Sequence, residues 1–180
     1  MKNILAIKTD VHPKTEDIDW QAVYDYSLPK VFHYFCYKVG DPTLAEDLTQ
    51  ITFEKAWRSQ RNFHSDIGQI QPWLMGIARN VASDHFRKKV REVPLKEGSE
   101  RSFVTSFDEQ LQQKLDFEFI QSILTQFPER ERDLIAYKYG AELSNRAIAQ
   151  LTGLTETNVG TILHRVVGKL RMEWEKHHER

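Results

Sequence analysis

The chain has 180 residues, of which 25 are Lys or Arg and 26 are Asp or Glu, so its formal net charge is −1. This length allows one medium domain or two small ones, and the near-neutral charge excludes a uniformly basic nucleic-acid coat. The 40 % of hydrophobic residues suits a globular protein, and the single cysteine excludes a disulfide scaffold or a cysteine-cluster zinc site.

Nothing in the sequence predicts insertion into a membrane. No apolar run approaches the roughly 20 residues that span a bilayer. The apolar stretch near the N-terminus covers only Ile4–Ile7 and is too short for a signal peptide. We therefore expect a cytoplasmic protein.

The first part of the chain is predicted to be helical. A first helix begins near Asp17 to Trp20 and ends at Gly40, a residue type that commonly stops helices. Pro29 falls inside it, and because proline disrupts a helix interior we expect a break or kink there. Asp41 and Pro42 then suit the N-cap and first position of a second helix.

The second helix, within residues 41–60, has two contrasting faces. One arc is mostly apolar and is expected to be buried: Ala45, Leu48, Thr52, Phe53, Ala56 and Trp57. The opposite, largely polar arc consists of Asp47, Ile51, Glu54 and Arg58, with Gln50 at its edge.

Residues 61–71 have turn chemistry and predict a loop, and Trp73 to Val90 predicts a third helix whose second half is basic. Residues 51–93 carry a charge of +4, whereas residues 1–50 and 94–130 carry −3 each. Clustered cations indicate phosphate binding, although a solvated helix end would have the same composition.

Residues 93–113 are predicted to form a linker, because Pro94, Gly98 and several Ser and Thr interrupt any periodic pattern. Further helices are predicted from Leu115 to Phe127 and from Pro128 to Gly140.

The predicted fold is therefore all-α. Two small helical domains, residues 1–92 and 114–180, are joined by the flexible linker at 93–113.

The stretch from 143 to 171 has the chemistry of a helix-turn-helix. Ser144 can cap a short helix, Gly153 supplies the turn and Thr155 can cap a second helix. The second helix has an apolar stripe made of Val159, Leu163, Val166 and Leu170.

The opposite face of that second helix is small and polar, and consists of Thr157, Asn158, Gly160, Thr161, His164 and Arg165. Hydroxyls, an amide and an arginine can contact base edges and phosphates in a major groove. A generic pair of packed helices would show the same spacing, so the pattern alone leaves both interpretations open.

Three sequence blocks together resemble the extracytoplasmic-function sigma factors of bacteria, the small two-domain initiation subunits of RNA polymerase. The blocks are AEDLTQITFEKAW, WLMGIARNVASDHFRKK and FPERERDLIAYKYGAELSNRAIAQLTGLTETNVGTILHRVVGKLR. In order, they resemble the family's polymerase-docking helix, its promoter-opening helix and its C-terminal helix-turn-helix domain. The resemblance covers residues 20–172 and includes the family's spacing and linker.

The resemblance implies core RNA polymerase and promoter DNA as partners, and an inhibitory anti-sigma factor in many members. It assigns polymerase docking to Asp47, Gln50, Glu54 and Arg58. It assigns contact with the minus-ten element, including capture of a flipped base, to Phe63, His64, Ser65, Asp66, Gln69, Arg79, Asn80, Asp84, Arg87, Lys88 and Lys89. It assigns contact with the minus-thirty-five element to Thr157, Asn158, Thr161, His164 and Arg165. For Phe63 and Trp73, core packing and base stacking both remain open.

Three positions depart from the family pattern. Ile51 stands where the family usually has an acidic residue, and Gly160 and Ile162 stand where it often has Lys and Arg. Two usual phosphate contacts are missing, and a glycine inside a helix costs about 1 kcal/mol relative to alanine. We therefore expect the C-terminal domain to contact promoter DNA weakly and only with polymerase.

Other functions fit parts of the pattern. A helix-turn-helix regulator with an N-terminal helical sensor domain is one alternative, but a sensor does not need a docking arc followed by a basic helix. An interaction module without initiation activity is another, motivated by Ile51 and Gly160. The sequence has no glycine-rich phosphate loop, nucleophile elbow or metal-ligand spacing, so we expect no enzyme, catalytic residue, cofactor, metal site or small-molecule substrate.

Overall fold

The computed structural model describes residues 19–63, 69–91 and 107–178. Over these ranges the chain is almost entirely helical and contains no strand, which confirms the all-α prediction. The elements are α1 (Trp20–Val39), α2 (Pro42–Ser59), the 3-10 turn η1 (Gln60–Asn62), α3 (Ile70–Arg91), α4 (Phe107–Leu124), α5 (Glu129–Ile135), the π-helix η2 (Ala136–Gly140), α6 (Asn145–Thr152) and α7 (Glu156–His178).

The N-terminal domain is a bundle of α1, α2 and α3, whose boundaries follow the predicted signals. Gly40 ends α1 with a φ of 74°, and the Asp41 carboxylate accepts a hydrogen bond from the backbone N–H of Thr43 at 2.9 Å. Of the break or kink predicted at Pro29, no break occurs, because α1 is one continuous helix of 20 residues. Packing of its apolar second half, including the fully buried Val31, offsets the hydrogen bond that proline cannot donate.

Small side chains let α2 and α3 lie against α1. Ala45 and Ala56 of α2 are buried, as are Leu74 and Ala78 of α3. The predicted inward face of α2 is correct except at Trp57, whose side chain is 59 % exposed.

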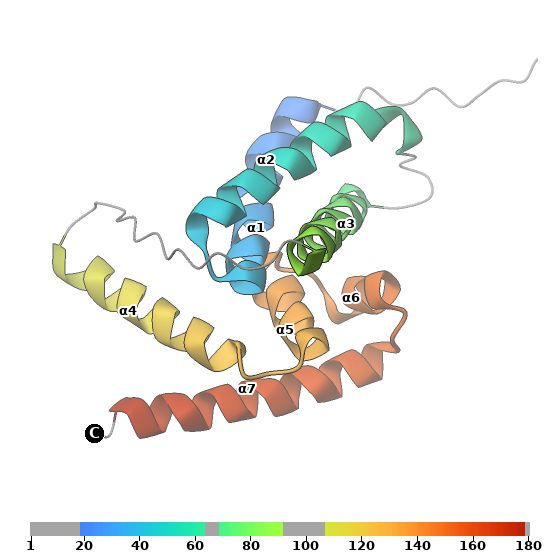
Figure 1. Cartoon of the computed structure of the whole chain (residues 1–180). Helices are drawn as coiled ribbons and strands as arrows, with labels where there is room; N and C mark the ends of the chain where they lie inside the picture. Colours follow the sequence, from blue (N-terminus) through green and yellow to red (C-terminus); the bar gives the residue numbers. More distant parts are fainter. Residues whose placement is uncertain (1–18, 64–68, 92–106, 179–180) are drawn as a thin grey trace, which may run out of the picture.

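The C-terminal domain consists of α4, α5, η2, α6 and α7, with the long α7 supporting the shorter helices (Figure 1). Helix α4 starts at Phe107, so residues 107–113 are helical and the segment between the domains is shorter than predicted. The helix-turn-helix follows the prediction: Ser144 caps α6, Gly153 has a φ of 74°, and Thr155 accepts a hydrogen bond from the backbone N–H of Asn158.

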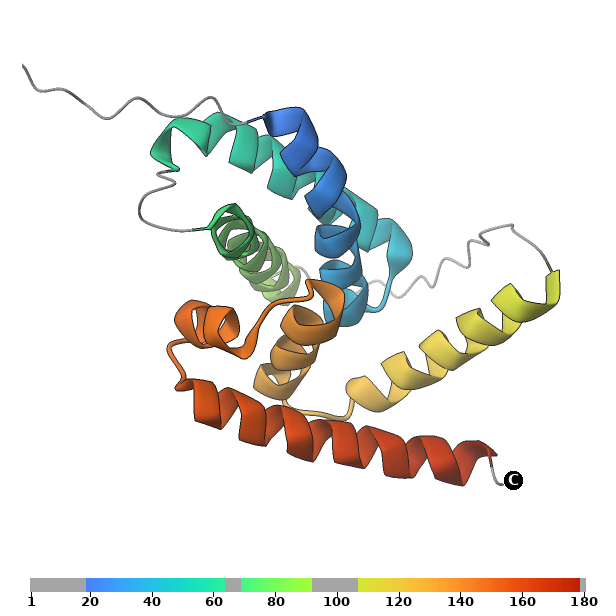
Figure 2. The ribbon, with the colours of Figure 1, turned by 180° about the vertical axis from the view of Figure 1, so that it is seen from behind.

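The two domains share one hydrophobic core rather than lying apart. Tyr34 of α1 stacks on Tyr137 of η2 with ring centroids 5.0 Å apart. Gly140 lies so close to α1 that a Cβ added there would be 2.7 Å from the Tyr34 Cα. Figure 2 shows η2 and α6 beside α1 and α3 from behind. A glycine is therefore needed at 140 for this approach.

Polar groups also pair across the domain boundary. The Lys38 ammonium, buried at the end of α1, lies 3.1 Å from the Glu129 carboxylate and also pairs with Asp133. Burial is the main reason why the pKa of Asp133 is raised, and it outweighs the nearby Lys38 charge. The Gln71 side chain donates to the Ala141 carbonyl at 2.8 Å, and Gln121 donates to the Cys36 carbonyl at 2.9 Å. These contacts join the domains in one defined orientation.

Candidate nucleic-acid interface

The outer face of α2 presents the four residues assigned to polymerase docking: Asp47, Gln50, Glu54 and Arg58. All four are exposed, and the Arg58 guanidinium lies 2.6 Å from the Glu54 carboxylate one turn earlier. Ile51 lies on the same face with 39 % of its surface exposed. This face is therefore an exposed surface of mixed polar and apolar character.

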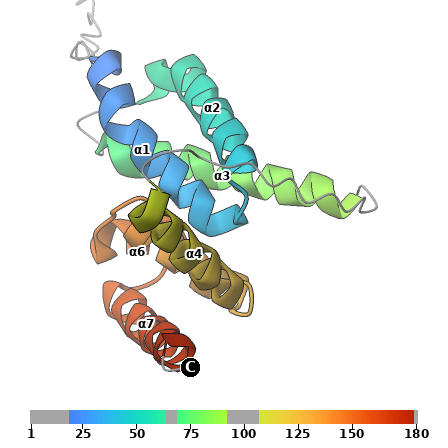
Figure 3. The same ribbon diagram turned by 90° about the vertical axis from the view of Figure 1, so that its left-hand side faces the viewer.

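Helices α2 and α7 lie at opposite ends of the molecule, with α6 between them (Figure 3).

An aromatic cluster links α2 to the segment before α3. Trp20 lies between Trp57 and Trp73, with ring centroids 6.2 Å from each. Phe63 is only 5 % exposed and packs on Trp73 with centroids 5.3 Å apart. Of the two possibilities left open for Phe63, core packing and base stacking, this structure shows core packing.

A groove of about 670 Å³ runs between α2 and α3. It brings together one residue assigned to polymerase docking and three assigned to minus-ten contact: Arg58, Asn80, Asp84 and Arg87. Asn80, Asp84 and Arg87 recur at one-turn intervals along α3 and therefore share one face.

Asp84 holds two cations of the groove in place. One carboxylate oxygen lies 3.4 Å from the Lys55 ammonium, and the other lies 2.9 Å from the Arg87 guanidinium. Asp84 therefore links α2 to α3 and brings the two cations to one carboxylate. Sequence reasoning missed Lys55, because its pairing with α3 depends on tertiary packing across 29 residues.

Arg79 is not part of this groove. Its guanidinium donates to the Leu151 carbonyl near the end of α6. The helix carbonyls at that end carry partial negative charge, which suits the arginine. The residue predicted to hold phosphate is thus engaged by the other domain in this arrangement.

The remaining residues assigned to the minus-ten element are described only in part. Gln69 and Lys88 are exposed. Lys89 lies in α3, but its side chain is outside the described part of the structure. His64, Ser65 and Asp66 lie outside the described residues altogether.

The second helix of the helix-turn-helix presents all five residues assigned to the minus-thirty-five element on its exposed surface: Thr157, Asn158, Thr161, His164 and Arg165. The predicted apolar stripe packs inward, with Val159 and Val166 fully buried. Arg165 is paired with Glu131 of α5, whose side chain is 12 % exposed. This pairing ties the Arg165 guanidinium to α5.

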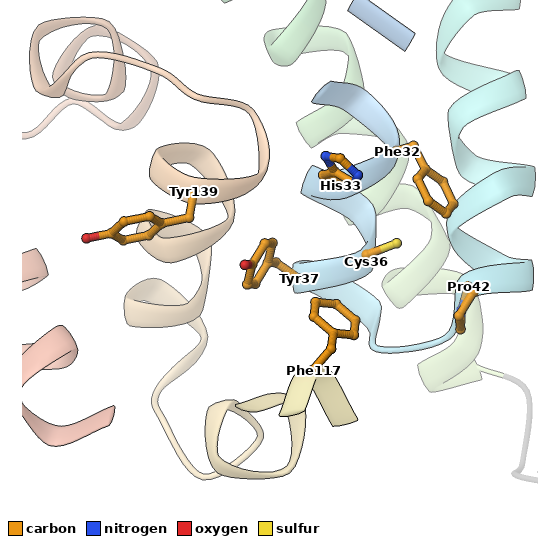
Figure 4. Close-up of a pocket in the computed structure, with 7 residues that line it drawn as sticks. All are labelled: Phe32, His33, Cys36, Tyr37, Pro42, Phe117 and Tyr139. Carbon is orange, nitrogen blue, oxygen red and sulfur yellow. The ribbon is translucent and has the colours of Figure 1, made fainter. Parts of the chain in front are cut away.

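An apolar groove of about 460 Å³ separates α1 from α4 and η2 (Figure 4). It is lined by Phe32, His33, Cys36, Tyr37, Pro42, Phe117 and Tyr139. Burial raises the pKa of the Cys36 thiol to about 12, so the thiol is protonated at neutral pH. The other lining groups are mostly rings, which offer van der Waals contact, and His33 adds an imidazole.

Two other classes of site are absent from the described residues. No group of three or more His, Cys, Asp or Glu side chains there could hold a metal ion. No helix in the same ranges is long and apolar enough to cross a bilayer.

Comparison with known proteins matches both halves of the chain. Residues 23–92 match the family described as Sigma-70 region 2, and residues 119–170 match Sigma-70, region 4. A helix-turn-helix regulator with a sensor domain does not account for the first of these matches.

Two curated relatives match over most of their length. The ECF RNA polymerase sigma factor SigM of Bacillus subtilis is 24 % identical over 150 residues, which cover 83 % of this chain and 91 % of SigM. SigL of Mycobacterium tuberculosis, also an ECF RNA polymerase sigma factor, is 28 % identical over 153 residues, with coverage of 84 % and 86 %.

Two solved structures have a similar fold. The sigma factor RpoE of Bartonella quintana, solved with the anti-sigma factor NepR, has a TM-score of 0.69 at 21 % identity over 87 % of this chain and 97 % of that one. CnrH, solved with the cytosolic domain of CnrY, has a TM-score of 0.60 at 20 % identity, with coverage of 87 % and 86 %.

The two sigma-70 regions follow each other in the order that the sequence blocks predicted, and together they span more than half of the chain. Their curated relatives are sigma factors of one class. The chain belongs to the extracytoplasmic-function sigma factors, which bind core RNA polymerase and direct it to promoter DNA to initiate transcription.

Proposed function

We propose that three surfaces of this sigma factor divide the work of initiation. The outer face of α2 docks on core polymerase, the groove between α2 and α3 holds the unpaired strand of the minus-ten element, and the exposed face of α7 contacts the minus-thirty-five element. The groove carries the proposal, because an amide (Asn80) lies among three cations in an open cleft of about 670 Å³, and cations beside a polar base-contacting group suit a single strand. The protein acts without catalytic residues of its own, in the cytoplasm, where core polymerase transcribes.

The test of this function is transcription in vitro from a pool of promoter fragments. Core polymerase with the protein is expected to give selective transcripts that core polymerase alone does not give. No selective transcript, from a folded protein shown to bind core polymerase, would contradict the proposal.

Docking through α2 is tested by binding to core polymerase. Replacing both Asp47 and Gln50 with Ala removes one charge and one amide from an exposed face, so the fold is retained while affinity for core polymerase falls. Gln126→Ala, at an exposed amide beyond α4, is the matched control. Equal affinity of the double variant and the control would refute the assignment.

Contact with the unpaired strand is tested through its salt dependence. Lys88→Gln combined with Lys89→Gln is expected to reduce open-complex formation and to flatten its dependence on salt, because a variant that neutralises fewer phosphates releases fewer counterions. Lys176→Gln, at the far end of α7, removes the same kind of charge elsewhere. An unaltered slope in the α3 variant would leave the basic run as a solvated helix end.

We further propose that the two domains separate when the promoter is bound. The minus-ten and minus-thirty-five elements lie about 25 base pairs apart, or about 85 Å of straight B-DNA at 3.4 Å per base pair. Arg79, assigned to the first element, is one hydrogen bond from α6 of the domain assigned to the second. One arrangement of the chain cannot satisfy both.

An anti-sigma factor is a proposed partner, supported by the similar fold of the Bartonella quintana protein that was solved in complex with one. Such a partner is expected to lower transcription by competing with core polymerase. An inhibitor that left core binding unchanged would contradict competition.

A further inference from the structure

A third groove, of about 380 Å³, lies beside the exposed face of α7, and of its lining residues only His164 has a role assigned above. Its floor is α7 and its rim includes η2 and the first residue of α6. The residues that give it chemical character are Lys138, Asn145, Gly160, His164, Gly168 and Arg171. None of the described residues that line it is acidic.

Two glycines keep this groove open. A Cβ added at Gly160 would be 3.5 Å from the Asn145 side-chain nitrogen, and one added at Gly168 would meet nothing within 4 Å. Longer side chains at these positions would project into the space. Gly160, which costs helix stability, thereby leaves room for something to approach the backbone of α7.

The cations of the groove differ from others in the same domain. Arg165 is paired with Glu131, and the Lys169 ammonium lies 5.7 Å from the centre of the Phe127 ring. Within the described ranges, neither Lys138 nor Arg171 forms an ion pair. Unneutralised cations that converge on an acid-free groove are suited to an anionic ligand.

His164 connects the groove to the exposed face of α7 that is assigned to the minus-thirty-five element, because it belongs to both. From Thr157 to Arg171 the helix extends about 21 Å at 1.5 Å per residue. The major groove of B-DNA is about 12 Å wide. A helix that enters the major groove with Thr157 and crosses it therefore reaches past its edge, where the sugar–phosphate backbone runs.

We propose that this groove holds the phosphate backbone of duplex DNA beside the minus-thirty-five element, with Lys138 and Arg171 binding the phosphates. The proposal rests on the proposed function, since it requires α7 to face the promoter. Lys138 and Arg171 then supply affinity for the DNA backbone in place of the Lys and Arg that the family pattern has at 160 and 162. These two cations position the domain without reading sequence.

The first experiment measures promoter binding by the holoenzyme, reconstituted from core polymerase and the full chain, over a range of salt. Lys138→Gln combined with Arg171→Gln is expected to weaken binding equally for different minus-thirty-five sequences. It should also reduce the salt slope by about 1 for each phosphate that is no longer neutralised. Lys169→Gln removes one charge from α7 outside the groove and is expected to keep the wild-type slope.

A second pair of variants separates charge from folding. Gly168→Asp and Gly168→Asn place side chains of nearly equal size in open space, so both are expected to fold. The acid repels phosphate and is expected to weaken promoter binding several-fold more than the amide, with the difference shrinking in high salt. Equal binding by these two variants would overturn the proposal.

Three further outcomes would also overturn it: an unchanged salt slope in the Lys138 and Arg171 variant, a weakening confined to one minus-thirty-five sequence, or a weaker affinity for core polymerase instead of DNA. The last would make the groove a polymerase-binding surface. If the wild-type holoenzyme itself gave no selective transcript, the proposed function would fail. If it transcribed normally while these variants bound like wild type, only the groove assignment would fail.

Discussion

The surface that joins the two domains differs from the surfaces that face outward in how its charged groups are paired. At the joint, Lys38 is buried with Glu129 and Asp133, and Arg79 is bound to a backbone carbonyl. On the outside, Lys88, Lys138 and Arg171 form no ion pair within the described ranges. These cations of the joint are therefore bound within the chain, whereas the outward surfaces have, beside paired cations such as Arg58, cations left for a partner.

The groove between α2 and α3 lies between these two cases. Its cations Lys55 and Arg87 share Asp84, which fixes their positions but leaves them beside an open cleft. Preorganised cations lose less conformational entropy on binding than free ones. The difference predicts that changes at the joint alter stability, while changes outside alter binding.

The largest effect is expected at Lys38. Lys38→Met leaves the Asp133 carboxylate without its main partner, and removing one member of a buried pair costs about 3 kcal/mol of unfolding free energy or more. A double variant, Lys38→Met with Asp133→Leu, should regain much of this stability. Chemical denaturation of wild type, the two single variants and the double variant gives the coupling free energy between the two residues. Strictly additive changes in unfolding free energy would contradict a direct ion pair.

The same variant has a predicted pH dependence. Burial already raises the pKa of Asp133, and removing Lys38 raises it further. A carboxyl whose folded-state pKa exceeds its unfolded value stabilises the fold when protonated, and this stabilisation is lost as pH rises through the folded-state pKa. The defect of Lys38→Met should therefore be smaller near pH 4 than near pH 7.

Gly140 offers a change of shape without a change of charge. Gly140→Ala forces a Cβ to within 3 Å of the Tyr34 backbone, so the domains must shift apart. Overpacking of this kind costs about 1–3 kcal/mol. We expect a lower melting temperature and a larger radius in small-angle scattering. Gly168→Ala, in open space, should be neutral or stabilising, and similar behaviour of the two variants would contradict a close joint.

The single cysteine reports on the same joint. Cys36 is 7 % exposed and lines the groove that α4 and η2 form with α1. Its thiol, with a pKa of about 12, should react slowly with iodoacetamide at pH 8. Gly140→Ala is expected to speed labelling about tenfold, by exposing a thiol that burial had kept protonated. Equal rates in both proteins would mean that the joint stays closed.

The smallest effect is expected at Asp84. Asp84→Asn removes an acid beside the proposed path of the strand. At this partly exposed site the charge interaction that is lost amounts to about 0.2–1 kcal/mol. Affinity of the holoenzyme for non-template single strands should rise slightly, while discrimination between minus-ten sequences falls as Lys55 and Arg87 lose their fixed positions. Weaker binding to every strand would instead mean that Asp84 touches the strand directly.

Local signals in the sequence predicted much of this architecture. Asp41, Ser144, Gly40 and Gly153 end or begin helices where capping and turn chemistry place them. The polar arc of α2 and the face of α7 follow from helical periodicity, which depends only on neighbouring residues.

The tertiary pairings were not predictable in the same way. The pairing of Lys38 with Asp133 joins residues 95 apart, and that of Arg79 with Leu151 joins residues 72 apart. Each side chain alone resembles an exposed cation on a helix. Trp57 was expected in the core because it lies on the apolar arc, but it only packs against Trp20 of α1 and stays 59 % exposed. The periodic pattern of a helix does not show which other helix packs against each of its faces.

The most direct test of domain separation is the distance between the domains before and after promoter binding. Energy transfer can be measured between dyes at Tyr26→Cys and Met172→Cys, two residues that are 60 % and 53 % exposed, in a Cys36→Ser background. We expect efficient transfer in the free protein and a marked decrease in the complex with core polymerase and promoter DNA. Unchanged transfer in a complex that produces selective transcripts would contradict domain separation.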